Sequence, residues 1–128
     1  MYQLWYTRLM NKENDDEPIL DVVFYKIAAG NEPVREWLKS LPREDRKNSG
    51  EDIKTAQYGW PLGMHLIRKM ERGLWEARSN ISTGIARVVF IVKGAMIILL
   101  HGFVKKSQKT PPNELDTARR RLNNLEKD

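Results

Sequence analysis

The feature of this sequence that most constrains its fold is a series of short apolar segments between residues 66 and 104. The segments cover residues 66–71, 74–79, 85–92 and 96–104, and their content of β-branched and aromatic residues is typical of strands. The breaks at Arg72-Gly73, residues 80–84 and Lys93-Gly94 have the composition of hairpin turns. This pattern predicts an antiparallel meander of four strands.

Helical periodicity flanks the meander, and one further strand is predicted over residues 21–27. A helix is predicted from Pro33 to Pro42, and a more polar helix over residues 43–58. A last helix begins at Pro111-Pro112, with apolar residues at Leu115, Ala118, Leu122 and Leu125. The predicted fold class is α+β: an antiparallel sheet with an N-terminal helical hairpin and a C-terminal helix packed on it. We expect the helices to cover one face of the sheet.

The chain of 128 residues has the length of one ordinary domain. We assign residues 21–128 to this domain and residues 1–20, which combine aromatic residues with a polar stretch, to a flexible N-terminal extension. The absence of cysteine excludes disulfides, zinc–thiolate sites and thiol nucleophiles. The longest apolar stretch, residues 95–100, is too short to span a bilayer, and residues 1–20 do not resemble a signal peptide, so we expect a cytoplasmic protein.

Positive charge is concentrated in the predicted sheet. The net charge is +5, but residues 62–109 alone contain nine Lys and Arg against two acidic residues. Such a distribution favours a surface that binds a polyanion such as nucleic acid. The alternative is that these residues only solubilise the surface, although solubilising charge is usually interspersed with acids.

Two arginines of this segment are predicted to share one face of the sheet. In a hairpin, paired residues have a constant sum of numbers, and an odd sum places Arg78 and Arg87 on the same face. We favour the odd register because it also collects Trp75, Ala77, Val88 and Phe90 on the face that the helices need. Two guanidiniums on an open face would clamp a phosphate and stabilise a pentacoordinate transition state. The alternative is a pair of salt bridges, for example with Glu76.

Other residues of the basic segment are candidates for binding or proton transfer. We expect Arg68, Lys69, Lys105 and Lys109 to bind substrate, although Lys105 and Lys109 could equally belong to a generic basic loop. Glu76 and His101 are the candidates for a general base, and a lone histidine after an apolar stretch is more often structural. His65 and His101 have no carboxylate at ligand spacing, so neither a metal site nor another cofactor is predicted.

Five segments of the sequence resemble the HigB-like, phage-derived branch of the RelE toxin superfamily. They are Val22-Val23-Phe24-Tyr25, Pro33-Val34-Arg35-Glu36-Trp37-Leu38, Gly73-Leu74-Trp75-Glu76-Ala77-Arg78, Ala86-Arg87-Val88-Val89-Phe90 and His101-Gly102-Phe103-Val104-Lys105-Lys106-Ser107-Gln108-Lys109-Thr110-Pro111. The likeness covers about residues 21–126.

The resemblance implies a microbial RNase fold that enters the ribosomal A site and cleaves mRNA without a metal ion. The RNA 2′ hydroxyl would attack the adjacent phosphate and leave a 2′,3′-cyclic phosphate. The resemblance also implies a cognate helix-turn-helix antitoxin. The toxin would bind operator DNA only through this antitoxin.

The resemblance also assigns site residues. Arg87 matches the family's phosphate-binding arginine, Arg78 a basic position on the preceding strand, and Lys106 a basic residue after the last strand. Glu76 stands where some relatives have a second basic residue, and no tyrosine follows Tyr58 to stack on a base. Two alternatives to the toxin remain open: a noncatalytic nucleic-acid-binding module, and a structural or partner-binding protein.

Overall fold

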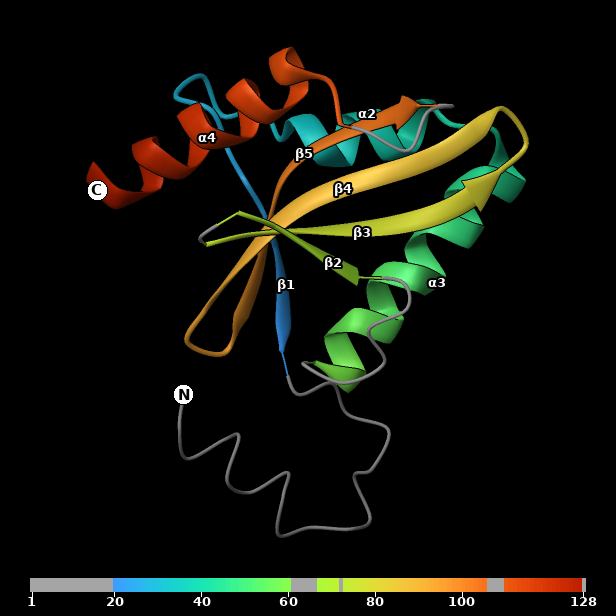
Figure 1. The fold of residues 1–128 in the computed structure, drawn as a ribbon, viewed down its shortest axis with the longest axis horizontal. Coiled ribbons are helices and arrows are strands. Elements are labelled where there is room, and N and C mark those ends of the chain that lie inside the picture. The colour runs from blue at the N-terminus through green and yellow to red at the C-terminus, as the bar shows by residue number, and fades with distance from the viewer. Residues whose placement is uncertain (1–19, 61–66, 72, 106–109, 128) are drawn as a thin grey trace, which may run out of the picture.

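The computed structural model describes residues 20–60, 67–71, 73–105 and 110–127. Along this part of the chain the strands are β1 (Asp21–Phe24), β2 (Ile67–Glu71), β3 (Leu74–Ile81), β4 (Gly84–Lys93) and β5 (Met96–Lys105). The helices are α2 (Pro33–Ser40), α3 (Arg43–Gly59) and α4 (Pro112–Lys127). The predicted α+β class and the order of elements are therefore confirmed (Figure 1).

The five strands form one sheet in the order β1-β5-β4-β3-β2. Strands β2 to β5 form the predicted antiparallel meander. The prediction of a purely antiparallel sheet is wrong, because β1 pairs with β5 in parallel, with Val22 opposite Ile97 and Phe24 opposite Leu99. The helical hairpin α2–α3 separates β1 from the meander, and a connection of this length allows a strand to join the sheet in either direction.

Helices cover both faces of the sheet, so the prediction of one covered face is also wrong. One core lies between the sheet and α2 and α3, and contains Val34, Ile53 and Ala56. A second core lies between the sheet and α4, and contains Leu74, Val89 and Ala118. The central strands are apolar on both sides, as β4 shows with buried residues from Ala86 to Ile91. Each face therefore needs a cover to remove its apolar surface from water.

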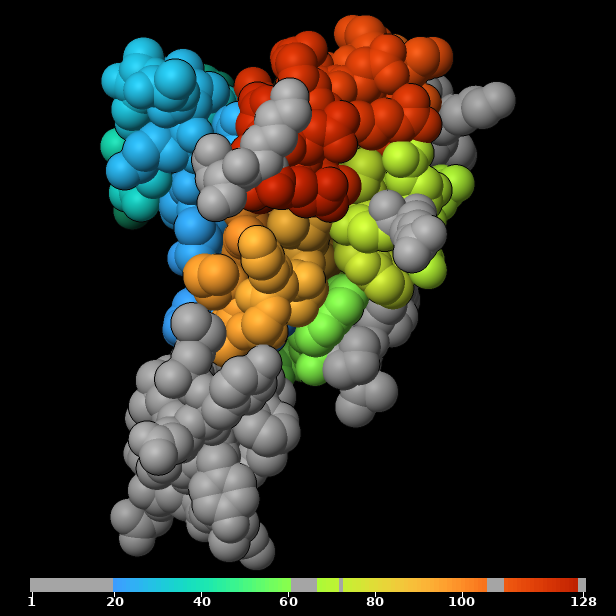
Figure 2. Space-filling model, turned by 90° about the vertical axis from the view of Figure 1, so that its left-hand side faces the viewer, coloured from blue at the N-terminus to red at the C-terminus, as the bar shows by residue number. Residues whose placement is uncertain are grey.

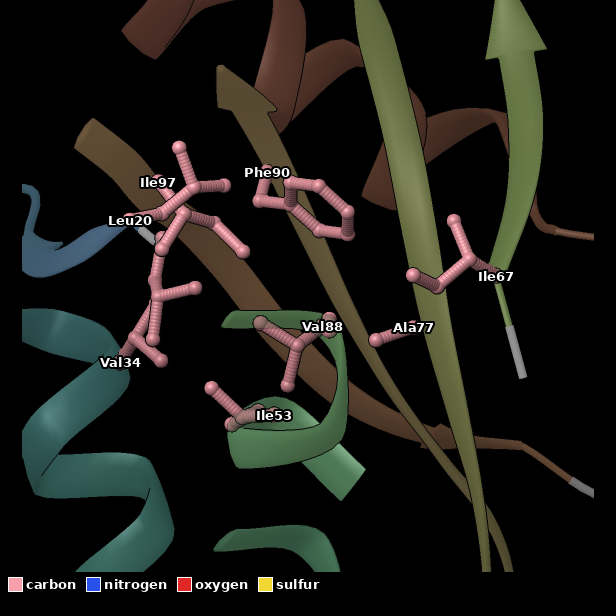
Figure 3. Close-up of a cluster of buried hydrophobic side chains, with 10 residues drawn as sticks. Leu20, Val34, Ile53, Ile67, Ala77, Val88, Phe90 and Ile97 are labelled. Atoms are coloured by element: carbon pink, nitrogen blue, oxygen red, sulfur yellow. The ribbon is translucent and has the colours of Figure 1, made fainter. Parts of the chain in front are cut away.

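The core under α2 and α3 follows the predicted register. Trp75 lies opposite Phe90 and Ala77 opposite Val88. Figure 3 shows Ala77, Val88 and Phe90 on the side where Val34 and Ile53 approach. We call this side the hairpin face and the side under α4 the α4 face. Aromatic packing continues at the edge of this core, where the ring of Trp60 meets those of Trp75 and Phe90 edge-on.

Element boundaries lie within two residues of the prediction except at β1, which ends at Phe24 and not at Ile27. Two other differences are informative. Strand β3 continues to Ile81, so the turn is shorter than expected, and Asp45 of α3 accepts hydrogen bonds from the Ser82 backbone N–H and hydroxyl at 3.0 and 2.6 Å. Leu20, which we placed in the N-terminal extension, is buried in the core of the hairpin face. Residues 1–19 lie outside the described residues. Among the helices described, none combines the length and hydrophobicity needed to cross a membrane.

Candidate functional site

The candidate site lies on the α4 face, at the end of the sheet where β3 and β4 approach their shared turn. Arg78 of β3 pairs directly with Arg87 of β4, so the prediction that they share a face is confirmed. Glu76 lies two residues before Arg78 on the same side of β3, and Arg68 of β2 pairs with Glu76. Three arginines from three adjacent strands therefore lie on the same face of the sheet as one carboxylate.

Glu76 and Arg87 form a buried ion pair. Neither side chain is exposed, and Arg87 Nη1 lies 3.6 Å from Glu76 Oε1. Arg78 Nε lies 3.7 Å from the same oxygen, but a quarter of the Arg78 side chain is exposed. The expectation of two guanidiniums on an open face is therefore wrong for Arg87. The salt-bridge alternative holds for this residue, in a buried rather than a surface form.

Thr110, at the approach to α4, completes this ion pair. Its hydroxyl donates a hydrogen bond to Glu76 Oε2 at 2.9 Å and accepts one from Arg87 Nη1 at 3.3 Å. No role was predicted for Thr110 from the sequence. Its position in a Lys-Thr-Pro segment after the last strand gave a signal, but its contact with β3 spans 34 positions and depends on the tertiary fold.

The closeness of the arginines affects the electrostatics of Arg87. Burial lowers the pKa of the Arg87 guanidinium from its ordinary value; the charge of Glu76 opposes this shift, and the charges of Arg78 and Arg68 add to it. An arginine nonetheless stays protonated at physiological pH. The cluster of Arg68, Glu76, Arg78 and Arg87, which we call the arginine cluster, thus carries three positive charges and one negative charge.

The remaining predicted binding residues are divided between the two faces. Arg68 is exposed on the α4 face, whereas Lys69 lies on the hairpin face with its ammonium 5.8 Å from the Trp75 ring centre. Lys105 pairs with Ile85, just as Phe103 pairs with Arg87. Because Lys105 follows Phe103 by two residues along β5, it lies on the same face as the arginine cluster. The structure therefore groups Arg68 and Lys105 with the cluster and separates Lys69 from it. Lys106 and Lys109 lie outside the described residues.

His101 joins β5 to α4 instead of facing open space. Its Nε2 lies 2.9 Å from Glu114 Oε1, and its Nδ1 lies 3.3 Å from Arg121 Nη1. Because a guanidinium can only donate, Nδ1 accepts and Nε2 carries the proton that is donated to Glu114. Both ring nitrogens are thus engaged, which favours the structural interpretation of His101 over the general base. Within the described ranges, no three or more histidine and acidic side chains form a group that could hold a metal ion.

A family comparison adds to this geometry. The model of the family described as "Phage derived protein Gp49-like (DUF891)" matches residues 36–123, more than two thirds of the chain. The chain belongs to the phage-derived Gp49-like family. No significant match was found among curated proteins.

The Gp49-like region contains the whole arginine cluster. It begins inside α2, ends inside α4, and includes Thr110, His101 and Glu114. Strand β1, which makes the sheet mixed, lies before it.

An apolar groove of this Gp49-like chain lies at the other end of the α4 face. It has a volume of about 480 Å³ and is lined by residues that include Gly73, Ile91, Lys93 and Leu122. Figure 2 views the molecule from the side on which α4 (red) lies above the β4–β5 turn (orange). The groove lies near this turn, and its lining includes none of the arginine cluster. We therefore base the candidate site on the cluster.

Proposed function

We propose that the chain is the toxin of a toxin–antitoxin pair and that it cleaves mRNA on the ribosome. The observation that carries this proposal is the convergence of Arg68, Arg78 and Arg87 around Glu76 on one face of the sheet. Membership of a phage-derived family and the resemblance to RelE and HigB toxins support it. The arginine cluster supplies the charge that a phosphodiester requires.

In the proposed reaction the RNA 2′ oxygen forms a bond to the adjacent phosphorus, and the bond from phosphorus to the 5′ oxygen breaks. The products are a 2′,3′-cyclic phosphate and a free 5′ hydroxyl. Water takes the proton of the 2′ hydroxyl, and Lys106 gives a proton to the leaving 5′ oxygen. The chain contributes mainly the positioning of the phosphate and the stabilisation of the charge that develops on the phosphorane.

The described residues have separate tasks in this proposal. Arg78 and Arg68, which are accessible, contact the phosphate, and Lys105 extends the basic surface along β5. Arg87 acts on the phosphate through its charge alone, because its buried guanidinium adds positive potential at the site without touching the substrate. The partners are mRNA and rRNA in the A site, together with a helix-turn-helix antitoxin, and the location is the cytoplasm.

Induced expression in a bacterial host tests the proposal. The wild-type chain should stop growth and translation, and primer extension should show discrete breaks within codons of translated mRNA. Arg78→Ala should relieve growth arrest and remove the breaks, whereas Arg119→Ala, which removes an arginine on the exposed side of α4, should not. Full toxicity of Arg78→Ala would contradict the proposed role of the cluster.

A noncatalytic nucleic-acid-binding protein is the second candidate, and one observation favours it. Glu76 is buried within ion pairs and both nitrogens of His101 are engaged, so neither of the two predicted bases faces solvent freely among the described residues. Such a protein would bind RNA with a strong salt dependence but leave the message intact. Binding without breaks in the primer-extension experiment would support this candidate and exclude the toxin.

A further inference from the structure

The two oxygens of Glu76 have different partners. Oε2 accepts the hydrogen bond from the Thr110 hydroxyl at 2.9 Å, while Oε1 faces Arg87 at 3.6 Å and Arg78 at 3.7 Å. A carboxylate can rotate about its last side-chain bond, and this torsion has only a broad preference. The hydroxyl of Thr110 restricts that freedom, because its hydrogen bond to one oxygen fixes the plane of the carboxylate and so holds the other oxygen towards the guanidiniums.

We propose that Thr110 and Glu76 are positioning residues that hold Arg78 in the orientation from which it contacts the substrate phosphate. This inference rests on the proposed function above and replaces the role of Glu76 as a base. Thr110 acts on Glu76, Glu76 acts on the Nε side of Arg78, and Arg78 touches the phosphate. Arg87 stabilises this arrangement from the buried side, since it forms an ion pair with Glu76 and a hydrogen bond with Thr110.

The charge of the cluster gives Glu76 a second task. Three guanidiniums and one carboxylate leave a net charge of +2 in the arginine cluster. A phosphodiester in the ground state carries one negative charge, whereas the phosphorane of the proposed reaction carries two. Glu76 therefore keeps the positive charge of the cluster equal in size to the negative charge of the phosphorane. It also limits how tightly the cluster binds uncleaved RNA. An interaction raises kcat only when it is stronger in the transition state than in the bound substrate.

The first experiment compares Thr110→Val, which removes the hydroxyl at nearly constant volume, with Thr110→Ser, which keeps it. On programmed ribosomes, Thr110→Val should lower kcat about tenfold to a hundredfold, because it removes a hydrogen bond to a charged group, with KM changed by less than about twofold. Thr110→Ser should restore most of kcat. Thr117→Val is the matched control, since Thr117 makes its hydrogen bond to Asn113 O within α4. Equal kcat values for the Val and Ser variants would overturn the inference.

A second measurement does not depend on RNA cleavage. In the free protein, the Nε–H NMR signal of Arg78 reports the orientation of its guanidinium against Glu76. The signal should move in Thr110→Val and stay in Thr110→Ser and Thr117→Val. If the wild type cleaves no RNA but the signal moves as expected, the proposed function fails and the positioning role stands. If the wild type cleaves RNA and the signal is unchanged in Thr110→Val, the positioning role fails alone.

Glu76→Gln provides an independent variant should Thr110→Val fail to fold. It keeps the shape of the side chain and raises the charge of the cluster by one. It should bind a short single-stranded RNA more tightly than the wild type and yet cleave message with a lower kcat. Weaker binding together with an unchanged kcat would overturn the proposed tuning role of Glu76.

Discussion

Glu76 is a fully buried carboxylate on an otherwise largely apolar face of the sheet. Burial of a charged group is unfavourable unless opposite charges and hydrogen bonds compensate for the lost water. Arg87, Arg78 and Thr110 provide this compensation from β4, β3 and the approach to α4. At this position the requirements of folding and those of phosphate binding are met by the same side chains.

Removal of the carboxylate should therefore destabilise the protein strongly. Glu76→Ala removes the carboxylate that is paired with the buried guanidinium of Arg87, and we expect the free energy of unfolding to fall by about 3–5 kcal/mol. Urea unfolding measures this change. Glu71→Ala is the matched control, because the pair of Glu71 and Arg119 is partly exposed and its loss should cost about 1 kcal/mol or less. Equal losses in the two variants would contradict the buried ion pair.

At the residue scale, the face of the sheet on which a side chain lies could be predicted from the sequence, but not whether that side chain is buried. The odd sum of paired residue numbers in the β3–β4 hairpin was enough to place Arg78 and Arg87 on one face. Arg87 can be buried because it is paired with Glu76 and hydrogen-bonded to Thr110. Thr110 lies 23 positions further along the chain, so no local sequence pattern reveals this contact. The same limit applies to His101, which is engaged by Glu114 and Arg121 of a helix packed on its strand.

At the scale of elements, α4 is attached to the sheet by polar contacts as well as by its apolar stripe. Arg121 Nη1 donates a hydrogen bond to the carbonyl of Leu100 at 2.7 Å, and Asn124 donates one to the hydroxyl of Tyr25 at 3.1 Å. Burial lowers the pKa of Arg121, a shift that the neighbouring Tyr25 opposes and Arg120 reinforces. Because only Pro111 separates Thr110 from α4, these contacts also determine where the Thr110 hydroxyl lies.

The contact between α4 and β2 should depend on pH. The Arg119 side-chain hydrogen bond, and secondarily its charge, lower the pKa of Glu71 below its ordinary value of 4.5, while desolvation opposes them. A carboxyl whose pKa is lowered in the folded state stabilises the fold above its unfolded pKa and loses this contribution as the pH falls through the folded pKa. The stability difference between wild type and Arg119→Ala should thus be present at pH 7 and vanish well below pH 4.5. A constant difference in urea unfolding across this range would contradict the contact.

The packing of α2 on β5 depends on a residue without a side chain. A Cβ at Gly102 would clash with the indole ring of Trp37. We therefore expect Gly102→Ala to lower the free energy of unfolding by about 1–3 kcal/mol, through overpacking of this contact. Gly50→Ala is the control, since it lies inside α3 with open space around it and should stabilise the helix by about 0.5–1 kcal/mol. Thermal unfolding of both variants measures the difference, and a stable Gly102→Ala would contradict this packing.

At the scale of the whole molecule, the positive segment does not form a single surface. Lys69 lies on the hairpin face, Arg87 is buried, and Arg68, Arg78 and Lys105 share the α4 face. The charge available to a polyanion among the described residues is therefore smaller than the excess of seven in residues 62–109 suggests. Within the part of the chain that the structure describes, the basic surface is narrow and lies beside the end of α4 that Thr110 precedes.

The salt dependence of RNA binding should reflect this narrow surface. For single-stranded RNA, the logarithm of the binding constant falls with the logarithm of salt concentration by about 0.7 per phosphate neutralised. Arg68→Ala and Arg78→Ala should each reduce the slope by about that amount, whereas Lys69→Ala should leave it unchanged. Fluorescence anisotropy at several salt concentrations measures the slopes. A reduction in Lys69→Ala equal to that in Arg78→Ala would show that RNA binds elsewhere.

From the sequence one can infer the α+β class, the order of the elements, an odd-sum pairing of β3 with β4 and the shared face of Arg78 and Arg87. These properties depend on local periodicity, turn residues and the alternation of a strand, all of which span a few residues. The tertiary structure alone decided that β1 runs parallel to β5, that α4 covers the face opposite α2 and α3, and that Thr110 closes a buried ion pair. Each of these depends on contacts between distant segments, whose free energy is set by the burial of the whole core and leaves no local pattern.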